Sequence, residues 1–197
     1  HIKMALDFYY EEYYVSKTAN KSGINNTPGV DANLGPEFSE ATIKSNLQKL
    51  HNNIISPLRT AFPPATNSGA KDIWITSAFR SKSLNEHPSV KGVENSQHRY
   101  GYAVDVFSLS SPTSLVWNWC YQNLPQWGQL IWEYPEYGGW TPGKTNISWV
   151  HISYVEGENK NNTSIATKRE DLHEMYKSEN TTRKGDYTHG IKIADEN

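Results

Sequence analysis

The chain has 197 residues, which is enough for one domain with a substantial buried core. It carries 19 Lys and Arg against 21 Asp and Glu, so the formal net charge of −2 gives no electrostatic reason to expect nucleic acid or an anionic membrane as partner. The single Cys120 excludes an internal disulfide and a cysteine-based zinc finger. No apolar run approaches the roughly 18 residues of a membrane span, and the first eight residues lack the layout of a secretory signal. We expect no membrane insertion, while location and oligomeric state stay open.

The first third of the chain predicts helices separated by turns. Residues 4–14 predict a short aromatic helix, and 19–37 form a turn-rich segment rich in Gly, Asn and Pro. Ser39 is a suitable N-cap for a longer helix, whose apolar residues recur at helical spacing: Ile43, Leu47, Leu50, Ile54 and Leu58. Pro57 is expected to kink or end that helix near Ile55. His51, next to two asparagines, is expected to face solvent.

The middle of the chain predicts four short strands and one further helix. The strands are 73–76, 102–107, 130–134 and 148–155, and the Gly-rich segment 135–147 would join the last two as a hairpin. The helix follows Ser111-Pro112, with a predicted buried stripe of Leu115, Val116, Trp119 and Cys120. The predicted class is therefore α+β, a small antiparallel sheet with flanking helices.

The composition changes after Gly157. Residues 158–167 are polar and rich in Asn, and 177–197 have little to bury. We therefore predict a domain over 1–157 and a polar C-terminal tail over 158–197, with one short helix around Leu172, Met175 and Tyr176.

Three side chains of metal-binding type stand out, two on predicted strands and one shortly before a strand. His98 and Asp105 are separated by six residues, with Gly101 between them where the backbone must turn. Asp105 lies in an otherwise apolar strand, where a carboxylate is costly unless it is paired or bound to metal, and His151 repeats this anomaly on a second strand. Two imidazoles and a carboxylate suit Zn²⁺ and leave a fourth position for water. The alternative is three ordinary polar groups that are satisfied inside a core.

The motif order resembles the zinc D-Ala-D-Ala carboxypeptidase family, which has the hedgehog/DD-peptidase fold. Ser96-x-His98-x-x-Gly101-x-Ala103-x-Asp105, followed by Trp149-Val150-His151, is similar to the pattern of its phage and bacterial cell-wall branch. Ser77-Ala78-Phe79-Arg80-Ser81 with Leu84-Asn85, and the stretch 16–28, resemble two further family segments. Ala78 stands where the family usually has glycine, and the likeness runs from roughly Phe8 to Tyr154.

The resemblance implies a zinc metallopeptidase that hydrolyses peptidoglycan stem peptides or cross-links, as a D-amino-acid carboxypeptidase or an endopeptidase such as a phage lysin. It implies His98, Asp105 and His151 as the metal ligands and the cell wall as the site of action. Arg80 would hold a substrate carboxylate or steady the developing oxyanion. Ser96 would donate a hydrogen bond to substrate or only shape the turn before His98.

One departure from the family pattern bears on catalysis. Many members carry Glu or Asp three residues before the last ligand, as general base toward the attacking water, but this position is Ser148. Glu133, on the strand expected to pair with 148–155, is the best substitute, against the alternative of an exposed Glu at a strand end. Glu136 is a weaker candidate. The alternative function is a zinc-bearing binding or structural module without catalysis, such as a virion component, and a third hypothesis is a metal-free binding domain.

Aromatic residues in the predicted hairpin loop give one further hypothesis. Tyr137 and Trp140 would form a wall for a peptide or glycan substrate, or else anchor the loop itself.

Overall fold

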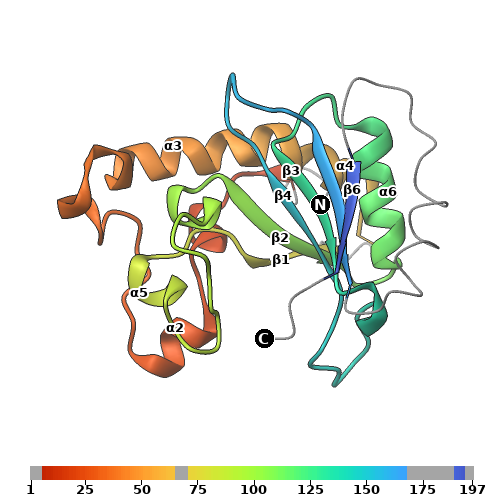
Figure 1. The fold of residues 1–197 in the computed structure, drawn as a ribbon, viewed down its shortest axis with the longest axis horizontal. Helices are drawn as coiled ribbons and strands as arrows, with labels where there is room; N and C mark the ends of the chain where they lie inside the picture. Colours follow the sequence, from red (N-terminus) through yellow and green to blue (C-terminus); the bar gives the residue numbers. More distant parts are fainter. Residues whose placement is uncertain (1–5, 65–70, 168–188, 194–197) are drawn as a thin grey trace.

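The computed structural model describes residues 6–64, 71–167 and 189–193, and within them the chain has an α+β architecture (Figure 1). The described part forms one sheet in the order β1-β2-β4-β3-β5-β6. Its strands are β1 (Ile73–Ser77), β2 (Ala103–Ser108), β3 (Gln129–Glu133), β4 (Trp149–Ser153), β5 (Asn162–Thr167) and β6 (His189–Ile193).

The sheet is mixed, which corrects one part of the prediction. β1, β2, β4 and β3 pair antiparallel as expected, and β3 and β4 form the predicted hairpin. β5, however, lies parallel to β3, and β6 lies parallel to β5. Both strands fall inside the predicted polar tail, so the sheet continues past residue 157. The predicted helix around Leu172 to Tyr176 lies outside the described residues.

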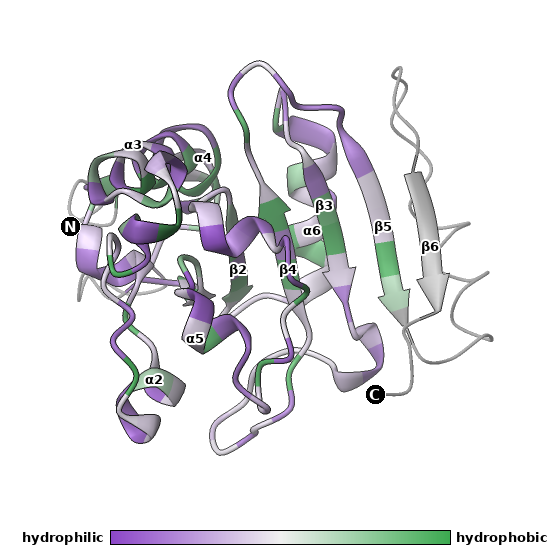
Figure 2. Cartoon of the chain, turned by 60° about the vertical axis from the view of Figure 1, so that its left-hand side comes forward, coloured by the Kyte–Doolittle hydropathy of each residue, from purple (hydrophilic) through white to green (hydrophobic). Residues whose placement is uncertain are grey.

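The polar composition of β5 explains why it escaped prediction. Its first half is hydrophilic in Figure 2, but the side chain of Ile165 is buried and joins the core. Thr163 is also buried, and β5 gains a complete backbone ladder with β3. Strand pairing thus compensates for the small apolar area of this segment.

The helices of the described residues are short, apart from two of 11 residues. The α-helices are α2 (Lys17–Ser22), α3 (Glu40–Leu50), α4 (Ser56–Ala61), α5 (Lys82–Asn85) and α6 (Thr113–Asn123). The 3₁₀-helices are η1 (Tyr10–Tyr13), η2 (Ala32–Leu34), η3 (Pro36–Phe38), η5 (Gln97–Tyr100) and η6 (Pro135–Tyr137). Of the helix predicted over 4–14, the structure shows the 3₁₀ turn η1, and the segment predicted as turns contains most of α2.

The predicted cap of α3 is confirmed, but its end differs from the prediction. The Ser39 hydroxyl accepts a hydrogen bond from the Thr42 amide, as an N-cap should. The helix does not end near Ile55. It widens into a π-helical turn, η4 (His51–Ile55), and continues as α4. Pro57 lies in the first turn of α4, where a missing amide proton costs little.

One face of the sheet packs against α3, α4 and α6 to form the core. Side-chain alternation along β2 and β4 directs Val104, Val106, Val150 and Ile152 to this face. On α6, Val116 and Cys120 are buried as predicted, but Leu115 is 51% exposed, and Trp117 and Tyr121 are buried in its place. The buried stripe of α6 is therefore rotated toward positions 117 and 121.

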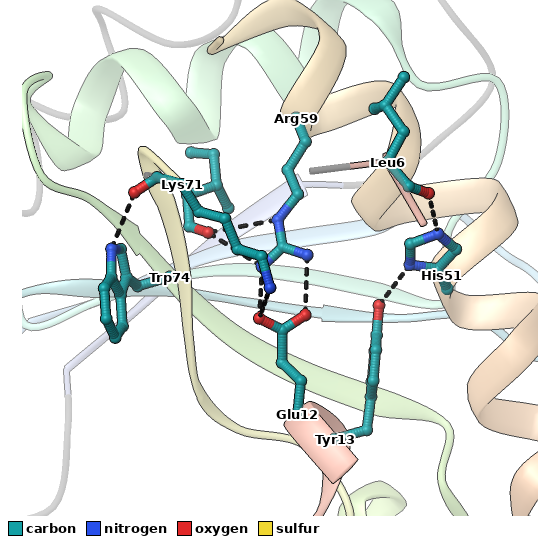
Figure 3. A network of polar contacts seen from close by, with 8 residues as sticks. Leu6, Glu12, Tyr13, His51, Arg59, Lys71 and Trp74 are labelled. Carbon is teal, nitrogen blue, oxygen red and sulfur yellow. Dashed lines mark hydrogen bonds and ion pairs between the residues drawn. The ribbon is translucent and has the colours of Figure 1, made fainter. Parts of the chain in front are cut away.

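A partly buried ion pair contacts β1, the edge strand of the sheet (Figure 3). The guanidinium of Arg59 donates to both carboxylate oxygens of Glu12, at 2.8 and 3.0 Å, and to the Ile73 carbonyl on β1. Lys71 binds the same carboxylate at 2.7 Å. The edge strand β1 thus has one of its carbonyls satisfied by a side chain.

His51 is buried, so the prediction that it faces solvent was wrong. Its Nε2 lies 2.6 Å from the Leu6 carbonyl, which can only accept, so Nε2 carries the proton (Figure 3). Its Nδ1 therefore accepts a hydrogen bond from the Tyr13 hydroxyl at 2.7 Å. Burial lowers the pKa of His51, which favours this neutral form.

Within the ranges that the structure describes, no helix combines the length and the apolar character that a membrane crossing requires.

Candidate metal centre

The structure brings the three predicted metal ligands together on the sheet face opposite α3, α4 and α6. Asp105 of β2 and His151 of β4 are direct cross-strand partners, so their side chains lie on the same face. His98 comes from η5, immediately before β2. Gly101 ends η5 with a φ of +72°, a left-handed conformation that suits glycine and turns the chain into β2. One ligand atom from each of the three residues lies within 4.8 Å of the other two.

The separations between these atoms fit a tetrahedral ion. Two donors bound to zinc at tetrahedral angles lie about 3.3 Å apart, because each bond is near 2.0 Å. Nε2 of His98 lies 3.4 Å from Oδ2 of Asp105, and Nδ1 of His151 lies 3.0 Å from Oδ1 of the same carboxylate. Both separations are compatible with a small divalent cation between the three side chains, and the contact of His151 with Asp105 is also of hydrogen-bond length.

Backbone groups of the segment 77–80 fix the orientation of His98. The Ala78 carbonyl lies 2.7 Å from Nδ1 of His98, so Nδ1 carries the proton and Nε2 keeps its lone pair toward Asp105. The Arg80 amide donates to the His98 carbonyl at 3.0 Å. Histidines that bind metal through one ring nitrogen typically donate the other N–H to a carbonyl or carboxylate, as Nδ1 of His98 does to Ala78.

Ser96 shapes the turn that precedes His98. Its hydroxyl accepts a hydrogen bond from the His98 amide at 3.3 Å and caps η5, and its side chain is buried. The geometry thus shows Ser96 shaping the turn before His98, which is one of its two predicted roles. The other role, a hydrogen bond to substrate, stays a prediction.

His151 leaves one polar atom without a partner. Its Nε2 is buried, and the described residues offer it no hydrogen bond. A buried ring nitrogen without a partner is unfavourable, so a water molecule is expected beside Nε2. The evidence for zinc is the donor set itself, since the ring nitrogens that face Asp105 and its carboxylate oxygens are the ligand types that zinc binds.

The electrostatics favour the protonation states that bind a cation. Burial on its own raises the pKa of Asp105, but His98 and His151 outweigh it and hold that pKa far below its usual range. Burial lowers the pKa of His98, more than Asp105 raises it. Asp105 is thus ionised and His98 neutral at pH 7, the forms that coordinate metals.

Arg80 lies against the cluster, where the sequence predicted a catalytic or substrate-binding role. Its Nη2 lies 3.3 Å from Oδ2 of Asp105, and its Nε donates to the Ser77 hydroxyl at 3.0 Å. Burial lowers the pKa of Arg80, while the charges of Asp105 and Glu133 raise it. The guanidinium is therefore held beside the ligand carboxylate and within the field of Glu133.

Glu133 lies on the same sheet face as the cluster. It pairs with Trp149 across β3 and β4, and the next pair on the same face of the sheet is Ile131 with His151. Ser148 is instead buried, with its hydroxyl accepting from Nε1 of Trp132 and donating to the Glu133 carbonyl. Ser148 therefore joins β3 to β4, and Glu133 lies two positions along β3 from Ile131, the cross-strand partner of His151.

A cavity of about 340 Å³ opens beside Asp105. Its walls come from β1, β2, β4 and the loop between β3 and β4, with the lining residues Thr76, Asp105, Tyr137, Thr145, Asn146, Ile147 and Trp149. Tyr137, predicted as a substrate wall, belongs to this lining. The prediction for Glu136 and Trp140 stays open, because neither lines the cavity.

Several supporting groups were not predicted from the sequence. The Ala78 carbonyl orients His98, the Ser77 hydroxyl holds Arg80, and the Thr76 hydroxyl donates to the Asp105 carbonyl. The sequence did mark the segment from Ser77 to Ser81 as similar to a family motif. It could not reveal the role of the Ala78 carbonyl, because every residue has a backbone carbonyl.

No family model, no curated protein and no solved structure matches this chain. The likeness to the zinc D-Ala-D-Ala carboxypeptidases thus rests on the motifs in the sequence and on the cluster that they form.

Proposed function

We propose that the protein is a zinc metallopeptidase that hydrolyses peptide bonds in peptidoglycan stem peptides or cross-links. The observation that carries the proposal is the convergence of His98, Asp105 and His151 on one sheet face, next to an arginine and a cavity. The fold family and the cell wall as site of action belong to the same proposal. They are supported by the order of the motifs along the chain.

The chain's own residues supply positioning and proton transfer in this proposal. A zinc ion held by the three ligands would polarise the scissile carbonyl and lower the pKa of a water molecule. Arg80 would stabilise negative charge that develops on the carbonyl oxygen, since its guanidinium already lies at the cluster. Glu133 would take the proton from the attacking water and pass it to the leaving nitrogen.

A second candidate is a zinc-bearing binding or structural module without catalysis. Ser148 favours this alternative, because it occupies the position where the resembled family carries its general base. Its hydroxyl is committed to Trp132 and Glu133, so it cannot act as a base at neutral pH.

Digestion of muropeptides separates the two candidates. The purified chain is incubated with cell-wall fragments alone, with a chelator, and with a chelator followed by Zn²⁺. The proposal expects peptide products that disappear with chelation and return with zinc. Stoichiometric zinc without products from any fragment would favour the module, and absence of zinc would favour a metal-free domain.

A further inference from the structure

Three aromatic side chains form a row on the sheet face that carries the metal ligands. Trp74 of β1 is the cross-strand partner of Phe107 on β2, and Phe107 lies two residues after the ligand Asp105. Trp149 likewise lies two residues before the ligand His151 on β4. Because side chains alternate along a strand and cross-strand partners share a face, all three rings lie on the ligand face. None of them belongs to the apolar core cluster on the other face, so core packing does not account for them.

The indole at the β1 end of this row is exposed and held in place. Trp74 is 50% exposed, and its Nε1 donates to the Lys71 carbonyl at 2.9 Å (Figure 3). Its neighbour Phe107 is buried. A ring that is already fixed by a hydrogen bond offers its apolar face to a ligand without a large loss of side-chain entropy on binding.

At its β4 end the row enters the cavity beside Asp105. Trp149 lines this cavity together with Tyr137 of η6. The ring of Tyr134 supports both of them, since it stacks on Tyr137 with centroids 5.1 Å apart and contacts Trp149 at 5.2 Å. The two rings that face the cavity are therefore held by packing from their own hairpin loop.

Neutral hydrogen-bonding groups surround these rings. Thr76, Thr145 and Asn146 add two hydroxyls and an amide to the cavity lining, and all three residues are exposed. A sugar ring has the matching surface. One of its faces presents C–H groups, which pack on the negative face of an aromatic ring, and its rim carries hydroxyls that donate and accept hydrogen bonds.

The spacing of the two indoles fits a short glycan. β2 lies between β1 and β4 in the sheet, so Trp74 and Trp149 are two strand spacings apart, or roughly 10 Å. A disaccharide has a similar length, so one sugar ring can lie against each indole. Trp149 in turn pairs with Glu133 on β3. A ligand that follows the row would therefore end beside the residue proposed as general base.

We propose that Trp74, Trp149 and Tyr137 form a binding site for an uncharged glycan, at least a disaccharide long, beside the metal centre. Binding of the sugar itself needs no metal and goes beyond peptide hydrolysis. One consequence rests on the proposed function: the centre would favour stem peptides that are still attached to sugar over free peptides.

Calorimetry with a sugar that carries no peptide tests this site without turnover. The probe is the tetrasaccharide of N-acetylglucosamine, added to the full chain after treatment with a chelator. The wild type is expected to bind it saturably. Trp74→Ala and Trp149→Leu are each expected to weaken binding by about tenfold, because each removes a ring that would cover apolar sugar surface.

The matched control is Trp119→Ala, which removes an indole from α6, on the core side of the sheet. It is expected to bind the tetrasaccharide like the wild type. Circular dichroism checks that each variant is folded, and the exposed position of Trp74 keeps the test decisive if Trp149→Leu does not fold. Absence of binding in the wild type, or equal binding by Trp74→Ala, would overturn the inference.

A second arm separates the glycan site from the proposed peptidase. Zinc-loaded protein receives one stem peptide in two forms, free and attached to a disaccharide. The attached form is expected to have a KM about tenfold lower, and this difference should shrink in Trp74→Ala but not in Trp119→Ala. If the tetrasaccharide binds and neither peptide is cut, the peptidase is contradicted and the glycan site stands. If both peptides are cut with equal KM and the tetrasaccharide does not bind, the peptidase stands and the glycan site is contradicted.

Discussion

Asp105 connects every part of the candidate centre. Its two carboxylate oxygens face the two imidazoles and Arg80, and its backbone pairs with His151. A buried carboxylate with several cationic or polar partners is costly to assemble, and such clusters concentrate at functional sites. At the residue scale the centre is therefore a better explanation of Asp105 than core packing is.

Glu133 is the residue whose role can be isolated most cleanly. Glu133→Gln is expected to lower the turnover of muropeptides by about 10²- to 10⁴-fold, because it removes the proposed proton acceptor. Zinc content should stay at the wild-type level, since Glu133 is not a ligand. The control Glu158→Gln changes an exposed residue of the loop between β4 and β5 and is expected to keep activity. Equal activity of both variants would refute the role of Glu133.

Glu12 gives a prediction about stability and pH. Burial alone raises its pKa, but Arg59 and Lys71 outweigh this and hold the pKa of Glu12 below its ordinary value. A lowered pKa adds stability above the ordinary pKa of a carboxylate, and this contribution is lost as the pH falls through the lowered value. Glu12→Gln is expected to cost about 3 kcal/mol at pH 7, because it leaves the buried Arg59 charge unmatched.

Urea denaturation from pH 7 to pH 3 checks this expectation. The difference in unfolding free energy between wild type and Glu12→Gln should shrink as the pH falls through the acid range. Glu11→Gln, one position away and outside the Arg59 network, serves as control and should track the wild type. A difference that is independent of pH would contradict the electrostatic account of Glu12.

The residue scale also shows what a sequence can and cannot reveal. His98, Asp105 and His151 could be selected because polar side chains are anomalous in apolar strands and fall in a recognisable order. His51 was misplaced, because its partners Tyr13 and Leu6 are 38 and 45 residues away and belong to another element. Helical periodicity carries no information about such distant hydrogen bonds.

At the scale of elements, the turn from η5 into β2 delivers His98 to the centre. Gly101 lies in the left-handed region, and a Cβ there would lie 3.1 Å from the Ile43 carbonyl and 3.3 Å from Leu47 on α3. The turn is thus constrained by its own backbone and by the packing of α3.

Two glycine variants separate these constraints. Gly143→Ala changes a glycine of similar φ, +80°, with open space around it, so it is expected to cost about 1 kcal/mol from backbone strain alone. Gly101→Ala is expected to cost more than this, because the neighbouring helix must also shift, and to weaken zinc binding. Denaturant unfolding of both variants measures the difference. Equal losses would show that α3 does not constrain the turn.

The elements that were predicted correctly follow local signals, and those that were predicted wrongly depend on contacts between elements. The Ser39 cap and the alternation in β2 and β4 depend on neighbouring residues and were predictable. The π-helical turn before Pro57 and the rotated stripe of α6 depend on how helices meet the sheet. β5 depends on pairing with β3, which compensates for a polar sequence that hydrophobicity alone assigns to a tail.

At the scale of the whole molecule, the two faces of the sheet have different roles. One face carries the apolar core with α3, α4 and α6, and the other carries the cluster and the cavity. The ligands come from segments 98–105 and 151, so the centre forms only when β2 and β4 pair. A bound ion is therefore expected to stabilise the folded chain, since the unfolded chain cannot offer the same geometry.

Metal stoichiometry shows whether His98, Asp105 and His151 bind one zinc ion. The protein is stripped with a chelator, titrated with Zn²⁺ and analysed for bound metal, alongside His98→Ala, His151→Ala and the control His87→Ala, whose histidine lies outside the cluster. We expect one tightly bound zinc per chain in the wild type and in His87→Ala, and a loss of tight binding in His98→Ala and His151→Ala. A wild type that binds no zinc, or ligand variants that retain it fully, would contradict the account.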